Sequence, residues 1–119
     1  MVDRMALGRW GEDLAVAHLE ASGYEVLARN WRCREGELDI ICLGGGALVF
    51  VEVKARSGLG YGAPAEAVSF VKARRIHGLA ARWLNESRPP GSHDLRFDII
   101  SVVRRLGHEP ELLHLQAAF

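Results

Sequence analysis

Two carboxylates and a lysine in the middle of the chain are the residue types that metal-assisted chemistry needs. Asp39 lies in the β-rich run 36–42, and Glu52 and Lys54 lie near the end of the run 47–56. Alternate residues of a strand share a face, so Glu52 and Lys54 should point the same way, with Asp39 alongside on the neighbouring strand. Charges at the end of an apolar strand are costly to bury unless they bind something. Carboxylate oxygens in such a cluster are suitable ligands for a divalent cation.

These residues are expected on the two arms of a β-hairpin. The β-rich runs flank the tract Gly44-Gly45-Gly46, which predicts a turn because glycine tolerates positive φ. The second run is apolar from residue 47 to residue 51, which is typical of a strand buried on both faces. The glycine tract lacks the GxxxxGK[ST] pattern and is therefore not interpreted as a phosphate-binding loop.

Further motifs accompany this hairpin in a fixed order along the chain. They are Gly11-Glu12, Arg29-Asn30-Trp31-Arg32, Gly36-Glu37-Leu38-Asp39, Phe50-Val51-Glu52-Val53-Lys54 and Arg96-Phe97-Asp98. The ordered set resembles the YraN-like uncharacterised bacterial family, which is similar to the Holliday-junction resolvases of the PD-(D/E)XK nuclease superfamily. Leu38 stands where that superfamily usually has proline before the motif aspartate. The resemblance covers nearly the whole chain.

The resemblance implies a restriction-endonuclease-like α/β fold, a single domain over residues 1–119 with a central mixed β-sheet flanked by helices in the order αβββαββ. Residue patterns point to the same elements. Helical spacing predicts a helix over 4–22 that ends at Gly23, and Ser69 is a suitable N-cap for a second helix reaching about residue 86. Strands are expected at 24–31, 96–103 and 112–115, beside the two arms of the hairpin.

The resemblance also implies roles for individual residues. Asp39, Glu52 and the backbone carbonyl of Val53 would bind Mg²⁺ or Mn²⁺, which lowers the pKa of water and so supplies a nucleophile. Lys54 would orient that water or stabilise charge growing on the phosphate. Glu12 would hold the outer waters of the metal. Glu37 shares the face of Asp39 and either assists it or is solvated.

Glu12 has two interpretations from spacing alone. It lies on an apolar flank of the first predicted helix with Val16 and Leu19. Its carboxylate either stays in water at the helix edge or is aimed into the site. Spacing favours the first interpretation, because carboxylates are rarely buried, and the family resemblance favours the second.

Charge is unevenly distributed although the net charge is zero. Residues 1–53 hold five Lys or Arg and nine Asp or Glu, whereas residues 54–96 hold eight and three. The middle segment is therefore the expected phosphate-facing surface, with Lys72, Arg56 and Arg75 as nucleic-acid-binding candidates. Solvated surface charge is the plain alternative. For Lys72 the alternative is an amine that reaches water over a stem packed on the core.

Two other residues have structural and functional interpretations side by side. Trp31 either packs at the edge of the core or offers a stacking platform for an unpaired base. Asp98, in the apolar part of its predicted strand, either belongs to the family's motif set or simply pairs with Arg96 two residues away on the same face.

The sequence thus predicts a metal-dependent endonuclease that hydrolyses DNA phosphodiester bonds, in duplex or in branched and junction DNA. One alternative is a nucleic-acid-binding module that keeps the fold without cutting, and another is an interaction protein with a buried ion-pair network. A homodimer is expected for symmetric junctions, with residues 115–119 either at its interface or packed on their own domain. No membrane span or secretory signal is found, and Cys33 and Cys42 do not form a disulfide framework, so a cytoplasmic location is expected.

Overall fold

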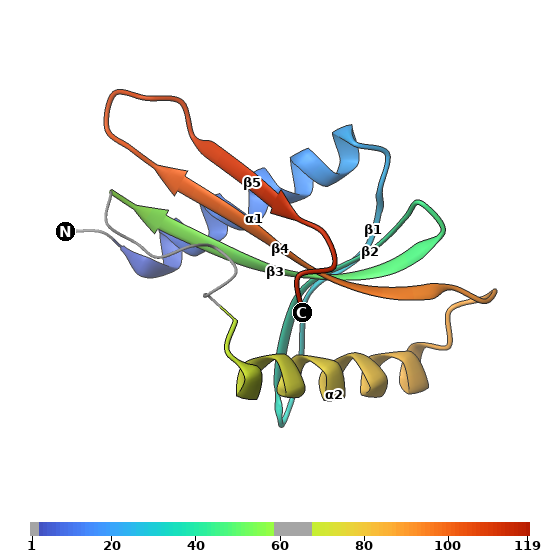
Figure 1. Ribbon diagram of the computed structural model, residues 1–119. Coiled ribbons are helices and arrows are strands. Elements are labelled where there is room, and N and C mark those ends of the chain that lie inside the picture. Colours follow the sequence, from blue (N-terminus) through green and yellow to red (C-terminus); the bar gives the residue numbers. More distant parts are fainter. Residues whose placement is uncertain (1–2, 59–67) are drawn as a thin grey trace.

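The computed structural model describes residues 3–58 and 68–119 and has two helices and five strands in that part of the chain. Their order confirms the predicted αβββαββ succession (Figure 1). The elements are α1 (Arg4–Ala21), β1 (Glu25–Cys33), β2 (Gly36–Gly44), β3 (Ala47–Ser57), α2 (Phe70–Ser87), β4 (Asp94–Arg104) and β5 (Glu111–Leu115). Asp3 caps α1 by accepting hydrogen bonds from the N–H groups of Met5 and Ala6, and Ser69 caps α2 as predicted.

The strands form one mixed sheet in the order β1-β2-β3-β4-β5. β1, β2 and β3 are successively antiparallel, β3 and β4 are parallel, and β5 is an antiparallel edge strand. The crossover between the parallel strands contains α2, as the sequence predicted. The two helices lie on opposite sides of the sheet (Figure 1). This arrangement confirms an α/β domain with a central mixed sheet.

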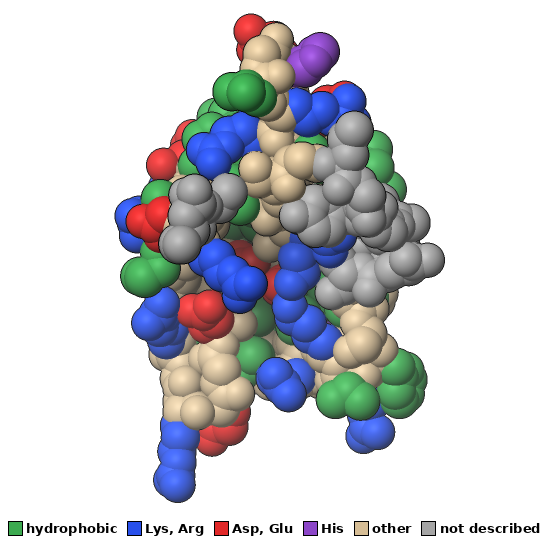
Figure 2. Space-filling model, turned by 90° about the vertical axis from the view of Figure 1, so that its left-hand side faces the viewer, with side chains coloured by type: hydrophobic (Ala, Val, Ile, Leu, Met, Phe, Trp, Pro, Cys, Tyr) green, Lys and Arg blue, Asp and Glu red, His purple; other side chains and the backbone are tan. Residues whose placement is uncertain are grey.

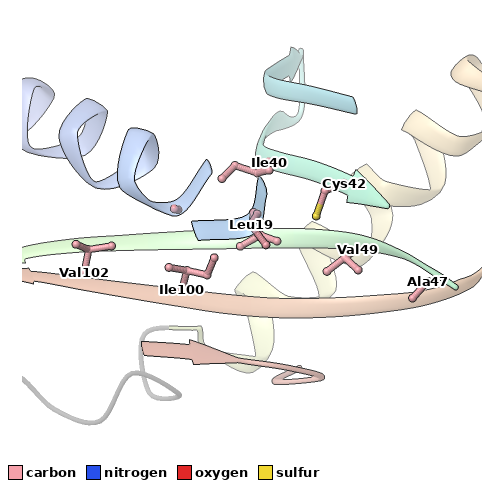
Figure 3. Close-up of a cluster of buried hydrophobic side chains, with 9 residues drawn as sticks. Leu19, Ile40, Cys42, Ala47, Val49, Ile100 and Val102 are labelled. Carbon is pink, nitrogen blue, oxygen red and sulfur yellow. The ribbon is translucent and has the colours of Figure 1, made fainter. Parts of the chain in front are cut away.

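Each helix closes its own hydrophobic cluster against the sheet. Beneath α1 lie Ala15, Leu19, Ile40, Cys42, Ala47, Val49, Val51, Ile100 and Val102 (Figure 3). Beneath α2 lie Leu38, Ile41, Leu48, Phe50, Ile76, Leu79, Ala80 and Trp83. Successive residues of β3 therefore alternate between the clusters, as expected for a strand buried on both faces. Trp31 packs at the edge of the α2 cluster, as its structural interpretation proposed.

A close approach of α1 to β3 depends on Gly11. A Cβ atom at this position would lie 2.5 Å from the Cβ of Ala55, so a larger residue would push the helix away from the strand. The neighbouring Glu12 is thereby held close to the end of β3. This contact explains why the first helix can contribute to a site built mainly on the sheet.

The C-terminal segment packs on its own domain. The N–H of Ala118 donates to the Phe97 carbonyl at 2.7 Å, and Phe119 packs against the α2 cluster. Nearby, Arg96 binds Asp98 with two hydrogen bonds of 2.9 Å, which confirms their predicted pairing. Of the two alternatives for residues 115–119, packing on the same domain is therefore the one observed.

Neither described helix is long and apolar enough to cross a membrane. Cys33 and Cys42 are both free thiols, and burial raises the pKa of the Cys42 thiol to about 12. Cys42 accordingly behaves as a small apolar residue of the α1 cluster.

Candidate functional site

The predicted site lies where β2 and β3 separate. Their ladder extends from the pair Gly44 and Ala47 to the pair Ile40 and Val51, and Asp39 follows immediately. Its carboxylate Oδ2 accepts a hydrogen bond of 2.9 Å from the N–H of Val53. Because N–H and C=O of one strand residue point to the same side, the Val53 carbonyl faces this gap as well.

The regular alternation of side chains also breaks at Asp39. Leu38 packs in the α2 cluster although Ile40, two residues later, packs in the α1 cluster. In a regular strand the two residues would share a face. On the adjacent strand Asn30 has a positive φ of 52°. The hairpin formed by β1 and β2 is thus bent at Asn30 and Asp39, and the bend leaves the Asp39 carboxylate in the gap between β2 and β3.

The electrostatic environment of Asp39 disfavours its charged form. Burial raises the pKa of Asp39, and the negative charges of Glu52, Glu37 and Glu12 raise it further, while the Val53 hydrogen bond lowers it. The net result is a pKa of about 7. Glu52, Glu37 and Glu12 have basic partners of their own, and the gathering of carboxylates around Asp39 is what a divalent metal ion would stabilise further.

Glu52 is neutralised by two lysines. Its Oε1 atom lies 2.9 Å from Nζ of Lys72 and 3.5 Å from Nζ of Lys54, and its side chain is only 11% exposed. Burial and the like charge of Lys72 lower the pKa of the Lys54 amine, although Glu52 raises it. For Lys72, burial lowers the pKa, but its interactions with Glu52 and Asp39 help to raise it overall. The structure therefore brings Lys72 into the site as a partner of Glu52.

Glu12 is buried rather than solvated. Its Oε1 atom accepts hydrogen bonds from Arg29 Nε at 2.9 Å and Asn30 Nδ2 at 2.8 Å. Arg29 also binds Asp13 at 2.6 Å, which fixes the guanidinium between helix and strand. The interpretation that leaves the Glu12 carboxylate in water is wrong, because the bent hairpin carries two donors over this flank of α1.

A pocket of about 1190 Å³ opens beside these groups. Glu12, Asp39, Val53 and Lys54 line it, and so do the cations Arg4, Arg9, Arg32 and Arg56. In Figure 2, Lys and Arg side chains gather around a hollow in which acidic side chains are visible. Glu52 is not among the lining residues but touches Lys54, which is. The pocket thus combines an acidic interior with a basic rim.

The nucleic-acid-binding candidates are only partly brought together. Arg56 lines the pocket and Lys72 contacts Glu52 behind it, whereas Arg75 is exposed on α2 and does not line the pocket. Sequence reasoning missed Arg4, Arg9 and Arg32, because the charge count assigned the basic surface to residues 54–96. A signal was present in α1, where Met5, Gly8, Arg9 and Glu12 recur at helical spacing and all line the pocket.

The donor set suits a hard cation such as Mg²⁺ or Mn²⁺. Within residues 3–58 and 68–119, no three His, Cys, Asp or Glu side chains are grouped so as to hold a metal by themselves. Magnesium commonly binds through one or two carboxylates and keeps several waters. Asp39, Glu52 and the Val53 carbonyl are oxygen donors of that kind, and burial followed by the charge of Glu52 raises the pKa of Asp39.

Comparison with known proteins identifies close relatives. Residues 11–102 match the uncharacterised protein family UPF0102. A UPF0102 protein of Nocardia farcinica is 51% identical, over 98% of this chain and 91% of the relative. Another from Rhodococcus opacus is 50% identical over the full length of both chains. One from Frankia casuarinae is 54% identical over 96% of each.

Proposed function

The chain belongs to the uncharacterised protein family UPF0102, the YraN-like family predicted from its motifs, and we propose that it is a metal-dependent endonuclease. Its substrate in this proposal is DNA, with branched or junction DNA preferred to plain duplex. The proposal extends to the restriction-endonuclease-like fold class and to the PD-(D/E)XK superfamily. The αβββαββ order and the placement of Asp39, Glu52 and Lys54 around one gap support it.

The observation that carries the proposal is the environment of Asp39. A half-buried carboxylate with a pKa of about 7 lies on a pocket whose rim contains four arginines. Negative charge in the interior would attract a cation, and positive charge on the rim would attract phosphates. A purely structural ion-pair network would instead satisfy Asp39 and lower its pKa.

Each site residue has a role in this proposal. Asp39, Glu52 and the Val53 carbonyl would hold Mg²⁺ or Mn²⁺, which would offset phosphate charge and lower the pKa of a water molecule. Lys54 places its amine on the pocket next to Glu52, where it stabilises charge growing on the scissile phosphate. Glu12, held by Arg29 and Asn30, also lines the pocket and would orient water there.

A cleavage assay tests the function directly. The protein is incubated with duplex, single-stranded, flap and four-way-junction DNA in the presence of Mg²⁺ or Mn²⁺, and with EDTA as the blank. Cleavage that requires the metal is expected. If the protein binds DNA but cleaves none of the tested DNA structures, the non-catalytic binding module becomes the preferred function.

Two substitutions separate catalysis from binding. Lys54→Ala should leave metal and DNA binding largely intact, because Lys54 is only one of many cations that attract DNA. It should abolish cleavage, because Lys54 is the cation on the pocket beside Glu52, where charge grows on the scissile phosphate. Glu52→Gln should lose both metal binding and cleavage, because it removes a ligand charge. Parallel loss of DNA binding and cleavage in Lys54→Ala would mean that Lys54 anchors DNA rather than acting in catalysis.

One observation favours the binding module as the second candidate. Both lysines already neutralise Glu52, so this carboxylate is satisfied without any metal. A domain that recognises branched DNA without cutting it would keep such an arrangement. The cleavage assay above distinguishes it from an enzyme.

A homodimer is part of the proposal, since two symmetric cuts in a junction need two sites related by a two-fold axis. The tail is engaged within its own domain through Ala118 and Phe119. Light scattering at about tens of micromolar protein, with and without a four-way junction, would detect the dimer, because its population depends on protomer concentration. A monomer under both conditions would count against it.

A further inference from the structure

Lys72 is a second lysine at the site, and it contacts Glu52 more closely than Lys54 does. We propose that Lys72 acts as an internal cation that neutralises Glu52 in the metal-free protein and exchanges with the divalent cation when the metal binds. This inference rests on the proposed metal site and adds a cation that competes with the metal for Glu52. Once displaced, the ammonium group of Lys72 becomes available to contact a substrate phosphate.

The first observation is the use of lysine in this chain. Of the 15 basic residues, only Lys54 and Lys72 are lysine, and the other 13 are arginine. Both lysines approach the same atom, Oε1 of Glu52, from different elements. Arginine would bind a carboxylate through a rigid fork, whereas lysine is a compact charge on a flexible stem. Lysine is thus the residue type that leaves a carboxylate more readily.

The second observation is the position of Lys72 relative to the pocket. Its N–H is bound by the Ser69 cap at 3.1 Å, so its backbone is fixed in the first turn of α2. Its Nζ atom reaches across to β3 and lies 2.9 Å from Glu52. Asp39, Val53 and Lys54 line the pocket, whereas neither Glu52 nor Lys72 does. A cation that enters through the pocket therefore meets Asp39 and the Val53 carbonyl first.

Charge balance then requires the exchange. In the described structure, Glu52 has two ammonium groups within 3.5 Å of one oxygen. A divalent cation on the same carboxylate would face both of them at short range, and the repulsion between like charges is strong in a part-buried site. Lys54 is two residues from Glu52 on the same strand, whereas Lys72 comes from a separate helix and has the more exposed side chain of the two, 34% against 26%. Lys72 is accordingly the one that leaves.

Metal affinity tests the exchange without relying on activity. Mn²⁺ binding is measured by calorimetry for the unmodified protein, Lys72→Met and Arg74→Met. Arg74 is the matched control because it is exposed on the same helix turn, with its guanidinium near the Phe70 ring. The Kd of Lys72→Met should fall about tenfold, because the competing charge is absent. Arg74→Met should bind like the unmodified protein.

A second measurement uses the unmodified protein, so it does not depend on the folding of a variant. Since the chain has only two lysines, amine acylation followed by mass spectrometry reports each of them separately. Addition of Mg²⁺ should raise the acylation rate of Lys72 several-fold. Metal binding with an unchanged or slower rate at Lys72 overturns the exchange.

The outcomes separate this inference from the proposed function. Tighter Mn²⁺ binding in Lys72→Met supports the exchange. Equal or weaker binding in Lys72→Met, with clear binding in the unmodified protein, overturns the exchange and leaves the metal site in place. Absence of Mn²⁺ binding in all three proteins overturns the metal site itself and the exchange with it.

Discussion

Two aspartates of this domain have opposite electrostatic environments. Asp98 in β4 is fully buried, and Asp39 in β2 is half-buried at the gap between β2 and β3. Burial alone raises the pKa of both carboxyl groups. At Asp98, hydrogen bonds from Arg96, His114 and the Ala117 N–H outweigh burial and lower the pKa. At Asp39, neighbouring acids add to burial and the pKa rises to about 7.

The difference shows what each carboxylate is arranged to do. Asp98 has donors at 2.7 to 3.0 Å from β4, β5 and the C-terminal segment, so it joins those parts of the domain. Asp39 accepts a hydrogen bond from the N–H of Val53 and lines the pocket, and the charges of Glu52, Glu37 and Glu12 act on it more strongly than that of Lys72 compensates. A fully compensated carboxylate stabilises the fold, whereas an uncompensated one marks a place where a ligand is expected.

The largest expected effect is the loss of Asp98. Asp98→Asn keeps the volume but leaves the guanidinium of Arg96 without its charge partner. Removing one member of a buried ion pair costs about 3–5 kcal/mol, so the free energy of unfolding should fall by that amount. Urea denaturation in EDTA measures it, with Asp39→Asn as the matched control. Asp39→Asn should be neutral or stabilising at pH 8, and equal destabilisation of both variants would erase the contrast.

The next effect is the pH dependence of stability. The pKa of Asp39 is about 7 in the folded protein and near 4 when unfolded, so the folded state binds the extra proton between these values. Stability from this group is therefore complete below about pH 4 and is lost as the pH rises through about 7. Asp98, whose folded pKa is lowered, contributes stability above about pH 4 that is lost on acidification.

Denaturation at pH 5 and pH 8 checks this sign. Between pH 8 and pH 5 the titration of Asp39 should add about 3 kcal/mol to the free energy of unfolding, and Asp39→Asn should lack this gain. Saturating Mg²⁺ should reduce the gain, since a bound cation favours the ionised carboxylate. The same pH response in Asp39→Asn would assign the titration to another group.

The sequence predicted most of the fold because the fold depends on local patterns. The apolar run 47–51, the glycine turn and the Ser69 cap each specify an element, and the structure has all three. The convergence of Glu52 and Lys54 follows from strand alternation alone. Other features required tertiary structure: the break in alternation at Asp39 comes from a bent hairpin, and the Lys72 contact joins residues that are 20 positions apart.

The basic rim shows the same limit. A count of charges by segment placed the phosphate-facing surface in residues 54–96, but Arg4, Arg9 and Arg32 come from the acidic first half. Many acids of that half are turned elsewhere or paired, as Asp13 is with Arg29. In a segment that contains both acids and bases, the rotation of the helix decides which side chains face the pocket. The helical spacing of Arg9 relative to Glu12 was the sequence feature that could have predicted this for α1.

The smallest expected effect concerns Glu37. It raises the pKa of Asp39, but less than burial and Glu52 do. Its side chain is 48% exposed and is bound to Arg32 at 2.9 Å, so solvent and that pairing screen its charge. Glu37→Gln should therefore lower the pKa of Asp39 slightly and change the free energy of unfolding by less than about 0.5 kcal/mol. A carboxyl-carbon NMR titration measures the pKa, and Glu52→Gln is the comparison. Because the Glu52 side chain is only 11% exposed and Glu52 is the larger cause, its substitution should lower the pKa of Asp39 much further. If the pKa of Asp39 fell equally in Glu37→Gln and Glu52→Gln, the Asp39 carboxylate would face solvent beside Glu37 rather than the gap between β2 and β3 that it shares with Glu52.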